Sequence, residues 1–382
     1  MKKIREFLRK EKELFEIIDR LETDILKFVE PQNTLVQQAK FFKALKKGIA
    51  YEPIFSYLPR NQLFTYFNLT PEYASMMKRL QELKFNETGF EKLLNKKRDE
   101  TIKKIELVRA IGSDAFPEKS IAYYGKPKAK LVRKAFEVLE QKPEKDNKKR
   151  FSSERAASYL QNMLNRKRID WNIVLEENMS ANAIVLPAEK TVKIKANQTY
   201  SMRGVRRLLV HEIETHVYRH INASIQPYRL LLEGASVDWL ETEEGLAVIN
   251  EVLFKNSSDA LIREYAGRVV AIHFATKHSF YETFKHMNEY FPAEKAYQLT
   301  QRAKRGCSAG KPGAFTKDYL YFKGAILVKE FLEGGGSLKE LYYGKLAINE
   351  LEAIKEVPVL KRPKYLPDYK KADFKAVEEL PF

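Results

Sequence analysis

The chain contains a single cysteine, Cys307, among its 382 residues. One cysteine excludes a disulfide within the chain and any zinc site built from several thiolates, and it fits a reducing compartment. Long apolar runs are also missing. The N-terminus has the positive charges of a signal peptide, but charged residues at 10–13 interrupt the apolar core that would have to follow. No stretch approaches the length of a membrane span, so we expect a cytoplasmic protein without a membrane partner.

Positive charge is in excess, with 68 lysines and arginines against 51 acidic residues and a formal net charge of +17. Basic proteins bind nucleic acids, anionic membranes or acidic peptides. Here lysines alternate with acids along helical stretches such as 91–104, which is typical of a solvated helix face, and no nucleic-acid-binding motif is recognisable. We therefore expect no nucleic acid as a partner and favour an acidic peptide. If the protein is not an enzyme, the alternative is a basic regulatory or nucleic-acid-binding module.

A hydrophobic content of 44% over this length is enough for a sizeable core. Most of the chain repeats apolar residues at helical spacing, which predicts a predominantly helical α+β protein. The stretch 141–150 has no apolar residue apart from Pro143 and indicates an exposed loop or linker. We expect an N-terminal helical region over residues 1–150, a second region over 151–356 and an irregular tail over 357–382.

Alternating apolar residues over 171–196 predict a small sheet just before a helix that carries two histidines. The alternating positions are Trp171, Ile173 and Leu175, then Ile184 and Leu186, and then Val192, Ile194 and Ala196. Residues 187–190 are expected to form a turn, so the sheet should be antiparallel. Either 183–186 or 190–196 would then be an edge strand that can hold an extended peptide by main-chain hydrogen bonds.

That helix carries the sequence His211-Glu212-Ile213-Glu214-Thr215-His216. In zinc proteases of the His-Glu-x-x-His type, a spacing of four residues puts both imidazoles on one helix face, with the glutamate beside the metal. Here the spacing is five, and five residues of a regular α-helix separate two side chains by roughly 140°. A π-bulge would restore their convergence. We therefore predict a π-type widening in a helix that runs from Ser201, as N-cap, to about His220.

A catalytic zinc takes three protein ligands and leaves a fourth position for water. Thr242 is a candidate N-cap for the next helix, whose first turn would hold Glu243 and Glu244. In gluzincin-type metalloproteases the third ligand is a glutamate on such a helix, and the analogous residue here is Glu244. His220 competes with His211, because His216 and His220 have the regular four-residue spacing, but the residue directly after His216 is Val217 and not a glutamate. Other acids stay open as third ligands: Glu233, Asp238, Glu241 and Glu243.

Together these stretches resemble a known family, the proteins with a Glu/Gln-Glu-Gly-Leu-Ala motif, whose eukaryotic members are the microtubule-associated tyrosine carboxypeptidases. The similarity covers roughly residues 50 to 350. It is carried by the His211–His216 sequence, Arg219, Glu243-Glu244-Gly245-Leu246-Ala247, and Lys311-Pro312-Gly313-Ala314-Phe315-Thr316-Lys317-Asp318 with Tyr321. The resemblance implies that 151–356 is a zincin-like metallopeptidase core with the small sheet beside the histidine helix. It also implies that His211, His216 and Glu244 bind Zn²⁺.

Glu212, next to the first histidine, is the expected general base, which takes a proton from water and later passes it to the leaving amine. The resemblance implies removal of a C-terminal residue, so the substrate's terminal carboxylate has to be bound by a cation in fixed geometry. Arg219, one turn past His216, and Lys317 are the candidates.

Tyr321, with Tyr319 as a substitute, is the candidate donor to the oxyanion, and Asp318 is expected to orient Lys317 or a histidine. The function we expect is removal of a bulky or aromatic residue from the C-terminus of a peptide or protein tail. A zinc endopeptidase, with a cleft open at both ends, is the alternative that keeps the same metal site.

Overall fold

The computed structural model describes residues 2–21, 28–57, 71–87, 89–141, 151–177, 179, 181–355, 357 and 359–382. The chain divides into two compact units, and each has buried apolar residues of its own. Unit 1 consists of Met1–Lys142, Ala235–Val237 and Arg263–Phe322, and unit 2 consists of Pro143–Gly234, Asp238–Ile262 and Lys323–Phe382. The sequence-based division assigned 263–322 to the second region, whereas these residues group with the N-terminal helices. Apart from Gln141, the predicted linker at 141–150 lies outside the described residues.

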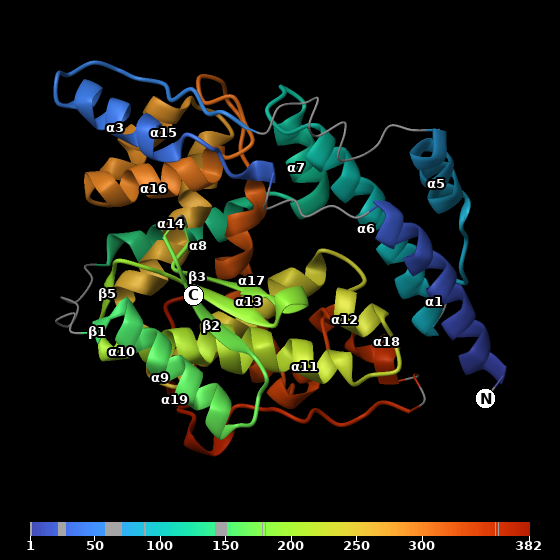
Figure 1. Cartoon of the computed structure of the whole chain (residues 1–382). Coiled ribbons are helices and arrows are strands. Elements are labelled where there is room, and N and C mark those ends of the chain that lie inside the picture. Colours follow the sequence, from blue (N-terminus) through green and yellow to red (C-terminus); the bar gives the residue numbers. More distant parts are fainter. Residues whose placement is uncertain are drawn as a thin grey trace. The chain divides into compact units, whose positions relative to one another are not determined.

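Unit 1 is built mainly from helices (Figure 1). Its core contains an aromatic cluster in which Phe41 lies 5.4, 4.8 and 5.0 Å, between ring centroids, from Phe280, Phe284 and Tyr297. The amphipathic helix expected over 3–30 ends at Leu21, and residues 22–27 are not among those described. The helices are α1 (Lys2–Leu21), α3 (Thr34–Leu45), α5 (Pro71–Glu82), η1 (Gly89–Glu91), α6 (Lys92–Arg109), α7 (Phe116–Tyr124), α8 (Ala129–Glu140), most of α14 (Asp259–Ala275), α15 (Phe280–Asn288), α16 (Ala293–Lys304), η4 (Thr316–Tyr319) and the start of α17 (Leu320–Glu333).

Unit 2 combines short strands with helices, which confirms a predominantly helical α+β protein. Its first part contains β1 (Phe151–Ser152), α9 (Ser153–Arg166), β2 (Asn172–Glu176), β3 (Ala183–Leu186), η2 (Pro187–Glu189), β4 (Thr191–Lys195) and β5 (Thr199–Tyr200). Then come α10 (Met202–Leu208), the π-helix η3 (Leu209–Val217), α11 (Tyr218–Ser224), α12 (Leu230–Glu233) and α13 (Asp238–Leu253). After α17 follow η5 (Leu338–Tyr342), η6 (Ile348–Glu350), α18 (Leu351–Lys355), η7 (Tyr369–Lys371) and α19 (Lys375–Glu378).

The sheet before η3 is mixed, and the expectation of a purely antiparallel sheet was wrong. Strand order is β2-β4-β3, with β3 antiparallel and β2 parallel to β4. The tight connection through η2, where Lys190 adopts φ of 46°, turns β3 back into β4 as expected. β4 then inserts between β3 and β2, so that β2 runs in the direction of β4. Of the two predicted edges, 183–186 lies at the edge of the sheet, whereas 190–196 forms its centre.

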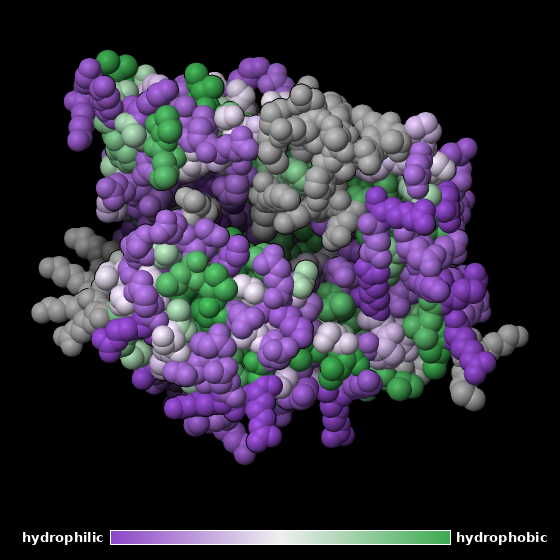
Figure 2. Space-filling model, in the orientation of Figure 1, coloured by the Kyte–Doolittle hydropathy of each residue, from purple (hydrophilic) through white to green (hydrophobic). Residues whose placement is uncertain are grey.

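One face of the sheet is buried and the other is partly open. Val192 and Ile194 of β4 are both 0% exposed, and their partners on β3 are Val185 and Ala183. Ile184, predicted to point inward, is instead 39% exposed on the open face, together with Val174, because the pairing of β3 with β4 sets its register. Figure 2 shows this apolar patch in green where β2 and β3 lie in Figure 1.

The helix from α10 through η3 to α11 begins at the predicted residue, since the Ser201 hydroxyl accepts a hydrogen bond from Gly204 N at 3.0 Å. Val205, Leu208 and Ile213 are buried along its apolar stripe. The predicted widening is confirmed, because Leu209–Val217 forms a π-helix. The helix that was predicted to begin after Thr242 is α13, and it begins at Asp238.

The C-terminal tail, which runs below α11 in Figure 1, is anchored by Asn222 of this helix and by Gln226, which follows the helix. Asn222 bonds to the backbone of Lys364 and Tyr365, and Gln226 bonds to both backbone groups of Lys361. The tail is largely irregular, as expected, but it includes η7 and α19. Within the described parts of the chain, no helix combines the length and apolar character that crossing a bilayer requires.

Candidate metal centre

The π-helix η3 brings the two histidines of the five-residue motif together. The ring centroids of His211 and His216 lie 5.0 Å apart. One nitrogen from each ring and a carboxylate oxygen of Glu212 all lie within 4.8 Å of one another. Both imidazoles and this carboxylate are therefore on one side of the helix, an arrangement that a regular α-helix with this spacing could not produce.

Glu244 of α13 faces both rings. Its Oε2 atom lies 3.8 Å from Nε2 of His211 and 3.8 Å from Nε2 of His216. Two ligand atoms bound to one tetrahedral zinc at its usual bond lengths are about 3.4 Å apart. Two imidazole nitrogens and one carboxylate oxygen are also a ligand set used by catalytic zinc sites. The donors of His211, His216 and Glu244 thus fit a zinc ion in both chemistry and spacing.

A second carboxylate holds the other nitrogen of each ring. Nδ1 of His211 lies 2.7 Å from Glu251 Oε1, and Nδ1 of His216 lies 2.7 Å from Glu243 Oε1. Opposite a carboxylate, Nδ1 carries the proton and donates it, which leaves Nε2 as the acceptor nitrogen. Each ring therefore presents its metal-binding atom toward Glu244.

The cluster attracts positive charge. Burial lowers the pKa of His211, but the carboxylates of Glu212, Glu244 and Glu251 outweigh burial and raise this pKa to about 10. Burial acts on His216 in the same way, and its carboxylate neighbours raise its pKa as well. A proton or a divalent cation can supply the charge that these acids favour.

Arg219 corrects one prediction from the sequence. Its side chain is 0% exposed, and it donates to the carbonyls of Leu341, Gly344 and Leu346 and, at 2.7 Å, to Glu243 Oε2. A guanidinium committed in this way has no surface for a substrate carboxylate. It instead fixes Glu243. Burial raises the pKa of Glu243, but Arg219, His216 and Lys345 together outweigh burial, so that this pKa is lowered.

The alternative ligands have other partners. Glu241 bonds to Lys323, Glu233 pairs with Arg229, and Asp238 accepts from Asn349 at 3.4 Å. His220 packs edge-on against Trp171, with 5.7 Å between ring centroids, and lies outside the group of convergent donors found among the described residues. Thr242, the predicted N-cap, lies inside α13, and its hydroxyl accepts a hydrogen bond from Ile348 N.

Comparison with known proteins gives this donor set a family context. Residues 39–380 match the family model described as microtubule-associated tyrosine carboxypeptidase. The chain belongs to this family. A mouse protein named putative tyrosine carboxypeptidase MATCAP2 is 30% identical over 188 residues, which are 47% of this chain and 35% of the mouse protein. Mouse microtubule-associated tyrosine carboxypeptidase 1 is 28% identical over 198 residues, 49% of this chain and 41% of that protein. The matched stretches thus span less than half the length of these relatives.

Four residues predicted for substrate binding or the oxyanion belong to unit 1, and two of them are committed to their own unit. Asp318 is 2% exposed and pairs with Arg302 at 2.6 Å and Arg305 at 3.6 Å, and its expected role of orienting Lys317 or a histidine stays a prediction. Tyr319 donates its hydroxyl to Tyr124 O at 2.7 Å and is 3% exposed, which removes it as a donor to an oxyanion.

The other two, Lys317 and Tyr321, stay predictions for this member of the family. Nζ of Lys317 lies 5.5 Å from the centre of the Tyr321 ring, and the guanidinium carbon of Arg268 lies 4.4 Å from the same ring. Tyr321 also stacks on Tyr265, with 5.7 Å between centroids and 7° between planes. Two cations and a second aromatic ring therefore surround the Tyr321 ring.

The carboxylates that hold Nδ1 of the two histidines were not predicted from the sequence. Glu251 follows Glu244 by seven residues, which is two helical turns on the same face of α13, so helical spacing could have identified it. Glu243 was considered only as a metal ligand. No pattern in the sequence indicated that Arg219 would hold it.

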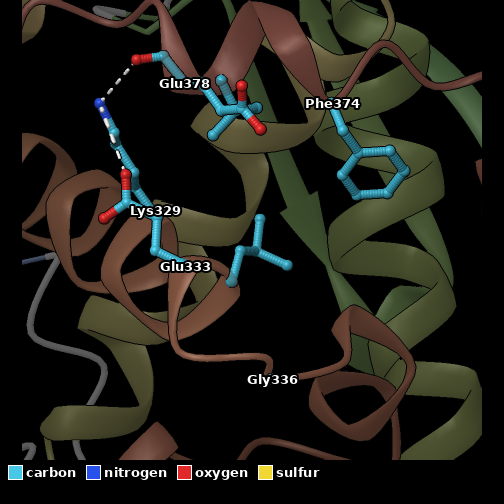
Figure 3. Close-up of a pocket in the computed structure, with 7 residues that line it drawn as sticks. Lys329, Glu333, Gly336, Phe374 and Glu378 are labelled. Atoms are coloured by element: carbon cyan, nitrogen blue, oxygen red, sulfur yellow. Dashed lines mark hydrogen bonds and ion pairs between the residues drawn. The ribbon is translucent and has the colours of Figure 1, made fainter.

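A shallow pocket of about 230 Å³ lies elsewhere in unit 2. Figure 3 shows it between the end of α17 and the C-terminal tail, with Lys329 donating to the carbonyl of Glu378. Its lining residues come from 329–336 and 374–378. None of them belongs to η3 or α13, so this pocket is separate from the metal centre.

Proposed function

We propose that this protein is a zinc-dependent carboxypeptidase that removes a bulky or aromatic residue from the C-terminus of a peptide or protein. The observation that carries the proposal is the convergence of His211, His216 and Glu244, with 3.8 Å from the glutamate oxygen to each Nε2. Membership of a family named for tyrosine carboxypeptidases supports the choice of reaction and of an aromatic terminal residue. The net charge of +17 favours an acidic tail as the substrate.

When bound by these three residues, a zinc ion supplies a Lewis acid that acidifies water and polarises the scissile carbonyl. Proton transfer and the orientation of the imidazoles are carried out by residues of the chain itself. Glu212, which is 9% exposed, accepts the proton of the attacking water and delivers it to the leaving amine. Glu251 and Glu243 keep both rings in the tautomer that leaves Nε2 unprotonated.

An extended substrate has an edge strand to bind. β3 lies at the edge of the sheet and contacts η3, so its backbone can add a peptide strand beside the helix that carries the metal ligands. In the same proposal, Lys317 binds the terminal carboxylate and Tyr321 donates to the oxyanion. A cytoplasmic location also belongs to the proposal, since the chain's single cysteine, Cys307, is buried and not part of a disulfide.

The test is a combined zinc assay and peptide digest. Purified protein is assayed for zinc by elemental mass spectrometry and is incubated with a pool of random peptides, whose products are sequenced by mass spectrometry. We expect about one zinc per chain and products that lack a single C-terminal residue. Cleavage at internal bonds would instead identify a zinc endopeptidase, and a protein that does not bind zinc would be a non-catalytic module.

A further inference from the structure

The π-helix that makes the five-residue spacing usable needs support, because five-residue bonding is rare and is seen mostly as short insertions in α-helices. Tyr218 N donates both to Ile213 O, five residues back, and to Thr215 O, three residues back, and α11 begins at Tyr218. When bonding then returns from five residues to four, one carbonyl is passed over. Counting along the chain from Ile213 O, that carbonyl is the one of Glu214.

Side chains bond to the backbone at this place. The hydroxyl of Tyr342 donates to Glu214 O at 3.0 Å. The hydroxyl of Thr215 donates to Val210 O at 2.9 Å. A threonine in a regular α-helix bonds to the carbonyl three or four residues back, whereas this bond reaches five residues back. It therefore belongs to the widened form of the helix.

Asn250 of α13 connects the two hydroxyls. Its amide nitrogen donates to Thr215 Oγ1 and to the Tyr342 hydroxyl oxygen, both at 2.9 Å. Its carbonyl oxygen accepts from the Tyr369 hydroxyl at 3.1 Å. Both protons of the amide are then used, and each hydroxyl donates one bond. The network joins η3, α13, η5 and the C-terminal tail.

The network is buried. Thr215, Asn250 and Tyr342 are each 0% exposed, so the loss of any one partner leaves a polar group without water. Burial raises the pKa of Tyr342, and its hydroxyl remains protonated and able to donate at neutral pH. No member is one of the metal-ligand candidates, and none is used by the proposed mechanism.

We propose that Thr215, Asn250, Tyr342 and Tyr369 are positioning residues that hold η3 in its π form and so keep His211 and His216 on one side of the helix. The proposal rests on the proposed function in that it treats these histidines as metal ligands. Without the network, regular four-residue bonding is the more stable form of this helix. In that form the two imidazoles point apart.

The experiment compares Thr215→Val and Tyr342→Phe, singly and combined, with two control variants. Thr283→Val removes a buried hydroxyl of α15 that bonds, at 2.7 Å, to the carbonyl of Ser279, the N-cap of the same helix. Tyr297→Phe removes a buried hydroxyl that has no hydrogen-bond partner among the described residues. Zinc affinity is measured by chelator competition, thermal unfolding monitors the fold, and crystal structures of the metal-free proteins show the backbone bonding over 209–218.

We expect the double variant to fold, to show four-residue bonding in this segment, and to bind zinc at least about tenfold more weakly. The control variants should keep both the π-helix and the zinc affinity. Tyr369→Phe, which alters only the outer end of the network, should fold in any case and lose zinc affinity by a smaller factor.

A π-helix that persists in the double variant, with zinc affinity within twofold of the unmodified protein, would overturn the proposal. So would a folded Tyr369→Phe variant with unchanged affinity if the double variant does not fold. Failure of the unmodified protein to bind zinc would reject the proposed function instead, and the metal-free crystal structures would still decide whether the network sets the helix form.

Discussion

Each histidine of the metal centre is held by two carboxylates with different tasks. Glu244 faces Nε2 of both rings, and Glu243 or Glu251 holds Nδ1. Glu212 is the remaining acid of the cluster, and it has no imidazole Nδ1 to orient. In the proposed function, this division separates the residues that bind the metal from the residue that transfers the proton.

Replacing Glu212 and Glu244 should therefore have different effects. Glu212→Gln should keep its zinc and lose about a hundredfold to ten-thousandfold in kcat/KM, because an amide cannot accept the proton. Glu244→Gln should lose both zinc and activity. Elemental analysis and a peptide assay on the two variants measure this. A metal-free Glu212→Gln protein beside a fully loaded Glu244→Gln protein would show that the two roles have been exchanged.

Arg219 should matter for stability rather than for substrate binding. Arg219→Met leaves the Glu243 carboxylate buried without its cation, so the free energy of unfolding should fall by about 3–5 kcal/mol. Adding Glu243→Gln to the same chain should restore part of the loss. Arg229→Met is the control, because Arg229 pairs with Glu233 at the surface, where such pairs contribute about 1 kcal/mol or less. Urea unfolding measures all three, and equal effects of the two arginines would contradict the assignment.

His220 should make stability depend on pH. Burial, together with Lys345, lowers its pKa from 6.5 to about 4, against the smaller opposing effects of Glu243 and Glu233. Between these two pH values the unfolded chain binds a proton that the folded chain does not, so stability falls as the pH decreases through this window. His220→Gln should remove this part of the decrease. Urea midpoints at pH 7, 5.5 and 4.5 test it, and parallel curves for the two proteins would speak against a neutral buried imidazole.

At the scale of elements, two glycines allow α13 and α17 to approach each other closely. A Cβ atom at Gly245 would lie 2.1 Å from the backbone carbon of Gly324, and a Cβ atom at Gly324 would lie 2.0 Å from Glu241 O. Such distances are possible only without side chains. Gly245 is the residue after Glu244, so this close helix contact is made directly beside a proposed ligand.

Gly245→Ala should therefore force the two helices apart and destabilise the protein by about 1–3 kcal/mol or more, with weaker zinc binding because Glu244 moves. Gly204→Ala is the matched control, since Gly204 is also helical and its nearest atom is an ordinary 3.4 Å away. That substitution should be neutral or stabilise by up to about 1 kcal/mol. Thermal unfolding and zinc titration measure both, and an equally stable Gly245→Ala protein would contradict the packing argument.

The elements also show what a sequence can and cannot reveal here. The π-helix could be predicted because a regular helix with five residues between His211 and His216 would point the two imidazoles apart, and one metal ion needs them together. The parallel pairing of β2 could not, because alternation reports which residues are apolar and not the order of strands in a sheet. The commitment of Arg219 depends on carbonyls at 341–346, more than a hundred residues away, and no local pattern encodes such a contact.

At the scale of the whole molecule, the candidate metal ligands His211, His216 and Glu244 belong to unit 2, whereas Lys317 and Tyr321 belong to unit 1. Family membership extends over both units, since the matched residues run from 39 to 380. With Arg219 withdrawn, Lys317 is the only cation of the original pair that is still a candidate for this carboxylate.

The most direct measurement of the central claim is the ratio of kcat/KM for one peptide with a free C-terminal carboxylate and the same peptide with an amidated C-terminus. Amidation removes the charge and places an NH₂ donor against a cation, so we predict a fall of more than about tenfold, or roughly 1.4 kcal/mol. Lys317→Met should shrink this penalty, and acetylation of the N-terminus should change nothing. Equal cleavage of the free and amidated peptides by the unmodified enzyme would contradict the carboxypeptidase assignment.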